Sequence, residues 1–333
     1  MSKQNSLRRK THKKVGRNRR NTSKKDSIHI PVESISHCHP GKTKFSNKCL
    51  PSSIYKSFNS IKNSLHSKSD GGVVNGRVNG TRVNGTRVNG TRVNGGDHYI
   101  LDKLVEKGLL NAAYATELRE KYLRPRMPDS WKKNPDEWLD NFNIRDVMKQ
   151  YEAIYPWFEY MGNFPIDFSA PNPYDDFDDE EAIRSNRLDK CLNPELCTLD
   201  LVEKYNKGKR GIGIIFNLDK HDGAGTHWMG MYVNIRDIEK PKIYYFDSFG
   251  YKVPPTIELF MKYIRANIQS KMPTCAVELL SNGRQFQMSR TECGMYSIYF
   301  LINMIHGVPF RKFVTRRVPD SDMLVLRNIL FSK

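Results

Sequence analysis

The sequence lacks the features of several large protein classes. No apolar segment follows its polar, basic start, so we expect no secretory signal. No stretch approaches the roughly 18 uncharged apolar residues that a membrane-spanning helix needs, so we expect no membrane contact. Only six cysteines are scattered over 333 residues. Without an export signal, this scarcity favours a reducing compartment and free thiols over a disulfide framework.

Acidic residues are almost absent from the first part of the chain. Residues 1–96 hold 21 Lys and Arg against three acids, which accounts for the whole net charge of +18. Clusters such as Arg8-Arg9-Lys10 are typical of a solvated tail, of a nuclear-import signal or of contact with nucleic-acid phosphates. We predict a basic, disordered tail over residues 1–70, with nucleic acid as a candidate partner.

A short repeat follows the tail. Arg-Val-Asn-Gly occurs four times between Arg77 and Gly95. Asn-Gly pairs favour tight turns, and the pattern offers little apolar surface to bury, which predicts a linker over residues 71–96.

Metal ligands occur together at one place in the tail. His37-Cys38-His39 and Cys49 supply four side chains that can bind zinc. Their spacing matches no standard zinc pattern, and adjacent side chains do not easily converge on one ion. We therefore expect no metal and no cofactor.

Residues 97–333 are formally neutral and predict one folded domain, with a helical part over 97–160 and a sheet and catalytic core over 207–306. Periodic apolar residues predict helices, and short runs rich in β-branched and aromatic residues predict strands. The predicted helices are 101–123, 144–155, 257–268 and 294–305, and the predicted strands are 211–216, 227–235, 242–247 and 275–280. The 294–305 helix is apolar on nearly every side, which indicates a buried central helix.

Cys293 directly precedes this buried helix. A thiol is mostly protonated at physiological pH, so a nucleophilic cysteine needs a base and surroundings that favour the thiolate. Unpaired N–H groups and the helix macrodipole stabilise an anion at this position. Cys275, Cys191 and Cys197 better suit the ordinary role of a small buried apolar side chain. We predict that Cys293 is a nucleophile.

A candidate base and its orienting carboxylate lie on neighbouring predicted strands. His227 begins one strand and Asp247 ends another, so an antiparallel hairpin would place both at the same end of the sheet. His221, in a loop, and His306, at the far end of the buried helix, are weaker candidates. A side-chain amide from Gln287 or Gln285 could stabilise an oxyanion, and the residues alone do not separate the two.

These motifs resemble the ubiquitin-like-protein (SUMO-type) protease family and its adenovirus-proteinase and large-DNA-virus relatives, over residues 138–305. The matching motifs are Trp138-Leu139-Asp140, His227-Trp228, Tyr244-Tyr245-Phe246-Asp247-Ser248, Gln287 and Glu292-Cys293-Gly294. The resemblance implies a papain-like α+β fold with a central, mostly antiparallel sheet. It implies Cys293 as nucleophile, His227 as base, Asp247 as orienter and Gln287 as oxyanion donor. Glu292 departs from the family pattern, in which an Asp often precedes the cysteine.

The resemblance also implies a substrate class. Tryptophans matching Trp138 and Trp228 form a narrow tunnel that admits a Gly-Gly backbone, because two flat indole faces leave no room for a Cβ. Viral members of the family process structural precursor proteins at Gly-Gly-X sites. We therefore expect a monomeric cysteine endopeptidase that acts on Gly-Gly-containing proteins in the virion and host cytoplasm, with the nucleus as the alternative location.

Three other functions fit parts of the sequence. A deconjugating protease for ubiquitin-like modifiers would use the same residues. An acyltransferase would form the same thioester and resolve it with an amine instead of water. A non-catalytic, nucleic-acid-binding virion protein would depend on the basic tail alone.

Gly-Gly pairs in the chain itself lead to a first prediction. Gly71-Gly72 and Gly95-Gly96 flank the repeat, so we predict that the enzyme removes its own basic tail there. Intact-mass spectrometry should show a shortened wild-type chain after incubation with reductant, and an uncut Cys293→Ala chain. A wild-type chain that stays whole after long incubation would contradict self-cleavage.

Overall fold

The computed structural model describes residues 38–41, 48–66, 87–88, 91–92, 96–172 and 191–332. Its centre is a five-stranded sheet in the order β3-β4-β5-β6-β7. The strands are β3 (Phe158–Pro165), β4 (Gly211–Asn217), β5 (Trp228–Asn234), β6 (Lys242–Phe246) and β7 (Glu278–Ser281). The two inner pairings are antiparallel and the two outer ones are parallel. The expected α+β fold is confirmed. Its sheet is mixed rather than mostly antiparallel, because helical crossovers bring β4 beside β3 and β7 beside β6.

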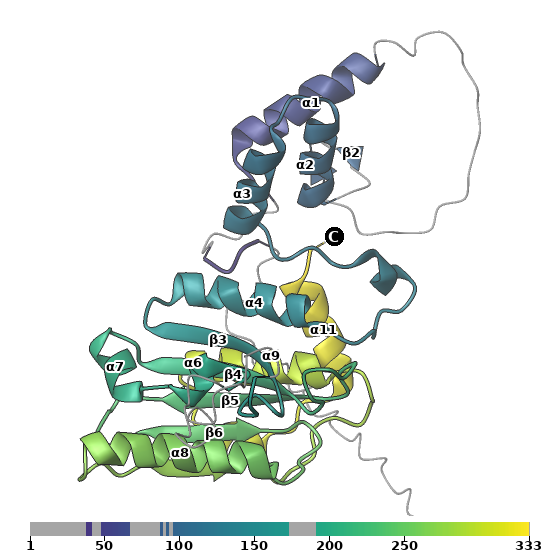
Figure 1. The fold of residues 1–333 in the computed structure, drawn as a ribbon. Coiled ribbons are helices and arrows are strands. Elements are labelled where there is room, and N and C mark those ends of the chain that lie inside the picture. Colours follow the sequence, from purple (N-terminus) through teal and green to yellow (C-terminus); the bar gives the residue numbers. More distant parts are fainter. Residues whose placement is uncertain are drawn as a thin grey trace, which may run out of the picture.

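Helices cover both faces of the sheet (Figure 1). One face packs against α4 (Asn141–Ile154), α9 (Cys293–Ile305), α10 (Phe310–Thr315) and α11 (Asp320–Leu330). The other packs against α6 (Pro194–Cys197), α7 (Leu201–Asn206) and α8 (Pro255–Lys271). The first six residues of both β4 and β5 are therefore buried, as expected for strands covered on both sides. All thirteen residues of α9 are buried, which confirms the predicted central helix.

Several predicted elements are confirmed, with shifted ends. The predicted helix 101–123 overlaps α2 (Asp97–Glu106) and includes α3 (Ala112–Tyr122), and 257–268 lies within α8. The last strand begins at Glu278 rather than at Cys275. The expected helical part over 97–160 and core over 207–306 can be compared with the positions of the elements. Strand β3 starts at Phe158, and α10 and α11 add buried residues to the core as far as Phe331.

The chain before residue 70 is not disordered throughout. Helix α1 (Ser52–His66) packs against α2 through Ile54, Tyr55 and Phe58 (Figure 1). The Tyr55 hydroxyl also donates a hydrogen bond to Asp97 Oδ1 at 2.8 Å. The predicted tail therefore ends earlier, because these three residues and the half-buried Ile61 supply enough apolar surface at helical spacing to dock this helix.

Other parts of the basic tail and most of the repeat lie outside the described residues. Residues 1–37, with their cationic clusters, and the pair Gly71-Gly72 belong to them. Within the repeat, β1 (Arg87–Val88) pairs with β2 (Thr91–Arg92) in an antiparallel arrangement.

The expectation of free thiols is wrong for four cysteines. Cys38 is bonded to Cys49 and Cys191 to Cys197, whereas Cys275 and Cys293 are free. The fold brings the Cα atoms of the first pair to 5.2 Å and those of the second pair to 6.7 Å, separations that a disulfide can span.

Neither a membrane span nor a metal cluster occurs among the described residues. None of their helices combines the length and apolar character needed to cross a membrane. No three His, Cys, Asp or Glu side chains in those ranges are grouped so as to hold a metal ion.

The contact between β5 and α9 leads to a second prediction. A Cβ added at Gly230 would lie 2.7 Å from Phe300 Cδ1, inside the core. Gly230→Ala should therefore reduce the free energy of unfolding by about 1–3 kcal/mol, through overpacking. Gly283→Ala is the matched control, because a Cβ there meets nothing within 4 Å. Urea denaturation of both variants tests this, and equal stability would contradict the tight packing of α9 on β5.

Candidate active site

The β5–β6 hairpin brings the predicted base and its orienting carboxylate together. His227 directly precedes β5 and Asp247 directly follows β6, and Gly230 pairs with Phe246 across the antiparallel ladder. His227 Nε2 lies 3.0 Å from Asp247 Oδ1, and both side chains are buried. The predicted placement at one end of the sheet is confirmed.

Asp247 is itself held by its neighbours. Its Oδ1 accepts a 2.7 Å hydrogen bond from the Phe249 backbone N–H. The buried Asn282 side chain accepts from the Asp247 N–H at 2.8 Å and donates to the Asp247 carbonyl at 2.7 Å. Sequence reasoning missed Asn282, because its only signal was a position just after the last strand. These bonds fix the carboxylate that orients His227.

The surroundings of His227 favour its protonated form. Burial alone would lower its pKa, but the electrostatic effects of Asp247 and Cys293 outweigh burial and raise the pKa from 6.5 to about 9. Asp247 binds Nε2, and Nδ1 is buried with no hydrogen-bond partner among the described residues. Nδ1 is thus the ring nitrogen that remains available to accept a proton from a thiol.

Cys293 is the first residue of α9 and is 2% exposed. Its own N–H and those of the first helical turn have no partner within the helix. A thiolate or an oxyanion formed at this point would face those donors. The position can therefore support nucleophilic attack on a carbonyl carbon.

The structure separates the two candidate amides. Gln287 is fully buried, and its Oε1 accepts a 2.7 Å hydrogen bond from the Ser248 hydroxyl. Its Nε2 donates to the Ser289 carbonyl at 3.0 Å, which uses one of its two N–H groups. Gln285 is exposed and donates to the Gln287 carbonyl. Because it is bonded to Ser248, the residue after Asp247, Gln287 is the better-placed candidate for an oxyanion donor.

The competing histidines lie elsewhere. His221 Nδ1 is 2.8 Å from Asp167 Oδ2, and His306 caps the opposite end of α9 from Cys293. Neither shares the contacts of His227.

A groove lies beside Trp228, the residue that follows His227. It has a volume of about 430 Å³ and is lined by Trp138 and Trp228 together with Leu192, Asn193 and the loop around His221. The Trp228 indole N–H donates to the Leu139 carbonyl at 2.9 Å, and Trp138 is 42% exposed. The two predicted substrate-binding tryptophans thus border one groove, beside His227.

Leu139 also lies against the nucleophile helix. A Cβ added at Gly294 would be 3.0 Å from Leu139 Cβ. Because Gly294 follows Cys293, the absence of a side chain there lets the segment over 137–139 approach the start of α9.

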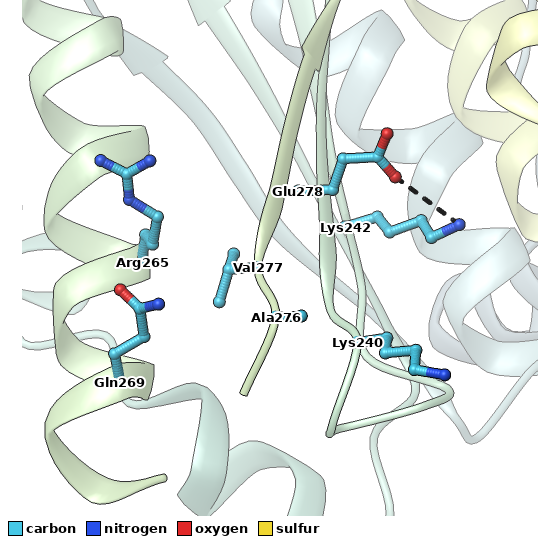
Figure 2. A pocket seen from close by; sticks show the side chains of 7 residues that line it. All are labelled: Lys240, Lys242, Arg265, Gln269, Ala276, Val277 and Glu278. Atoms are coloured by element: carbon cyan, nitrogen blue, oxygen red, sulfur yellow. Dashed lines mark ion pairs between the residues drawn. The ribbon is translucent and has the colours of Figure 1, made fainter. Parts of the chain in front are cut away.

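A second, larger hollow of about 620 Å³ lies at the edge of the sheet between α8 and β7 (Figure 2). It is lined by Lys240, Lys242, Arg265, Gln269, Ala276, Val277 and Glu278. Lys242 is the first residue of β6, whereas Asp247 follows the last residue of that strand. None of the predicted site residues lines this hollow.

Comparisons with known proteins match the part of the chain that holds His227, Asp247 and Cys293. Residues 203–333 match the family model described as the Ulp1 protease family, C-terminal catalytic domain. An Acanthamoeba polyphaga mimivirus protein, assigned as a thiol protease, is 28% identical over 59% of this chain. A SUMO-1 cysteine protease of African swine fever virus is 26% identical over 63% of it. The chain spans 57% of the mimivirus relative and 74% of the African swine fever virus relative.

The fold has a solved counterpart. The crystal structure of the African swine fever virus protease superposes with a TM-score of 0.63 and 18% identity, covering 91% of this chain and 97% of that one. At this identity the likeness concerns the fold. The family match shows an Ulp1-type cysteine protease domain over residues 203–333, and the viral relatives of this chain are thiol and cysteine proteases.

Proposed function

We propose that the protein is a cysteine endopeptidase that hydrolyses peptide bonds at Gly-Gly-containing sites. The observation that carries this proposal is the buried His227–Asp247 pair beside a free cysteine at the start of α9. Nucleophile, base and orienting carboxylate form the set that thiol-based acyl transfer requires.

In the proposed mechanism, Cys293 attacks the scissile carbonyl after its thiol proton has moved to His227 Nδ1. The Cys293 N–H and the Gln287 amide stabilise the oxyanion of the tetrahedral intermediate. His227 then donates its proton to the leaving amine, and a thioester to Cys293 remains. A water molecule, deprotonated by His227, attacks the thioester and releases the new carboxylate and the thiol. Asp247 holds the imidazole in place throughout.

Selectivity for glycine is proposed from the groove entrance. The hydrogen bond from the Trp228 indole to the Leu139 carbonyl fixes Trp228. Trp138, which precedes Leu139 in the chain, borders the same groove. Two flat rings at one entrance favour a backbone without Cβ atoms. We further propose viral structural precursors as the substrates and the virion and host cytoplasm as the location, because the relatives are proteases of large DNA viruses.

A pair of fluorogenic peptides tests the activity and its selectivity. The wild-type enzyme should cleave a Gly-Gly-X peptide at least about 100-fold more efficiently than the matching Gly-Ala-X peptide, because a methyl group must displace an indole ring. Trp138→Ala should reduce this ratio by widening the entrance.

Two cysteine variants are the controls for this assay. Cys293→Ala should abolish cleavage, whereas Cys275→Ala, which removes the other free thiol, should retain it. A Cys293→Ala variant that still cleaves would contradict the proposal. Mass spectrometry with an added amine separates the alternatives, since an acyltransferase would yield an amide instead of a free acid.

The raised pKa of His227 predicts the pH dependence of turnover. The imidazole carries the proton for the leaving amine below pH about 9, so kcat should fall about tenfold per pH unit above that value. Asp247→Asn removes a cause of the raised pKa, so the alkaline limb should move to lower pH, with kcat reduced at least about 100-fold. Asp167→Asn, which alters the similar pair with His221, should leave the limb in place. If Asp247→Asn left the alkaline limb of the kcat profile in place, a group other than His227 would control it.

A further inference from the structure

A buried ion pair lies directly beside the nucleophile. Glu292, the residue before Cys293, is 1% exposed, and Arg327 of α11 is 2% exposed. Arg327 Nη2 lies 3.2 Å from both Glu292 carboxylate oxygens. Burial raises the pKa of the Glu292 carboxyl, and the charge and hydrogen bond of Arg327 act against that rise. The proposed reaction assigns no step to this pair.

Arg327 also holds the segment that borders the groove. Its Nη1 donates a 2.5 Å hydrogen bond to the Glu137 carbonyl. Two residues later, the Leu139 carbonyl accepts the indole N–H of Trp228. One guanidinium is therefore connected to the residue before Cys293 and, through residues 137–139, to the residue after His227.

The guanidinium is fixed in its turn. It lies 4.5 Å from the centre of the Trp131 ring, and Trp131 packs edge-on against Phe331. A planar group with donors pointing in two directions suits such a bridge, whereas a lysine ammonium is a point charge on a flexible stem.

We propose that Arg327 is a positioning residue for the thiol–imidazole pair. It acts through Glu292, whose fixed carboxylate sets the orientation of the Glu292–Cys293 peptide, and through residues 137–139, which hold Trp228 beside His227. Loss of this bridge lets the thiol and the imidazole move apart, and small displacements of reacting groups are costly. The proposal rests on the proposed function, but its effect on the thiol is measurable without any substrate.

The test compares the rate of Cys293 alkylation by iodoacetamide with turnover of the Gly-Gly-X peptide, in full-length variants with Cys275→Ala as background. Arg327→Met should slow alkylation at pH 7 and lower kcat, each by at least about tenfold, with KM within twofold. Its alkylation rate should rise with pH as that of an ordinary thiol does. Arg327→Lys should recover little, because a lysine cannot bridge both partners.

A matched control exists at the other end of α9. Arg236 lies 4.6 Å from the centre of the Trp157 ring and donates to the Ile305 carbonyl at 2.8 Å. Arg236→Met removes a similar arginine contact from the end of α9 that is opposite Cys293. It should leave alkylation and kcat within about twofold of the background.

A double variant separates positioning from stability. Replacing both members of a buried pair often restores stability that a single replacement removes. Glu292→Gln combined with Arg327→Met should therefore recover the thermal midpoint lost in Arg327→Met, and provides a folded protein if the single variant unfolds. Its alkylation rate and kcat should stay low.

Recovery of both rates together with stability would overturn the proposal, because it would show a purely structural pair. Unchanged alkylation in Arg327→Met would overturn it too. A wild-type enzyme that cleaves no peptide would refute the proposed function alone, since the alkylation comparison would still decide the role of Arg327.

Discussion

The structure depends on enclosing one helix that has no polar side. All thirteen residues of α9 are buried, so every face of the helix needs an apolar partner. Strand β5 and its neighbours supply one wall, and α4, α10 and α11 supply the others. A helix enclosed in this way has little freedom to rotate or slide. Its first residue, Cys293, therefore has a fixed location in the molecule without any dedicated loop.

The other half of the site is positioned by strand pairing. An antiparallel register sets which residues lie opposite each other, so His227 and Asp247 meet because β5 and β6 pair as they do. The packing of α9 thus positions the Cys293 thiol, whereas the pairing of β5 with β6 positions the His227 imidazole. Contacts between α9 and β5, such as that of Phe300 with Gly230, fix the helix relative to the sheet.

The sequence predicted those parts of the fold whose signals are local. Alternating or continuous apolar runs located β4, β5, β6, α8 and α9, and the hairpin followed from two neighbouring strands. Strand β3 was missed because Gly162, at a positive φ, interrupts its pattern and its register shifts there. Arg327 and Asn282 were missed for another reason. Their partners lie 35 residues away in the chain, and no local pattern reports such a contact.

Helix α11 follows all three proposed catalytic residues in the chain and buries Met323, Leu326 and Leu330 against the core. During synthesis from the N-terminus, His227, Asp247 and Cys293 are therefore made before the helix that completes the enclosure of α9. Until α11 has left the ribosome, this face of the nascent chain stays open to solvent. The order of elements thus places completion of the site after synthesis of the three proposed catalytic residues.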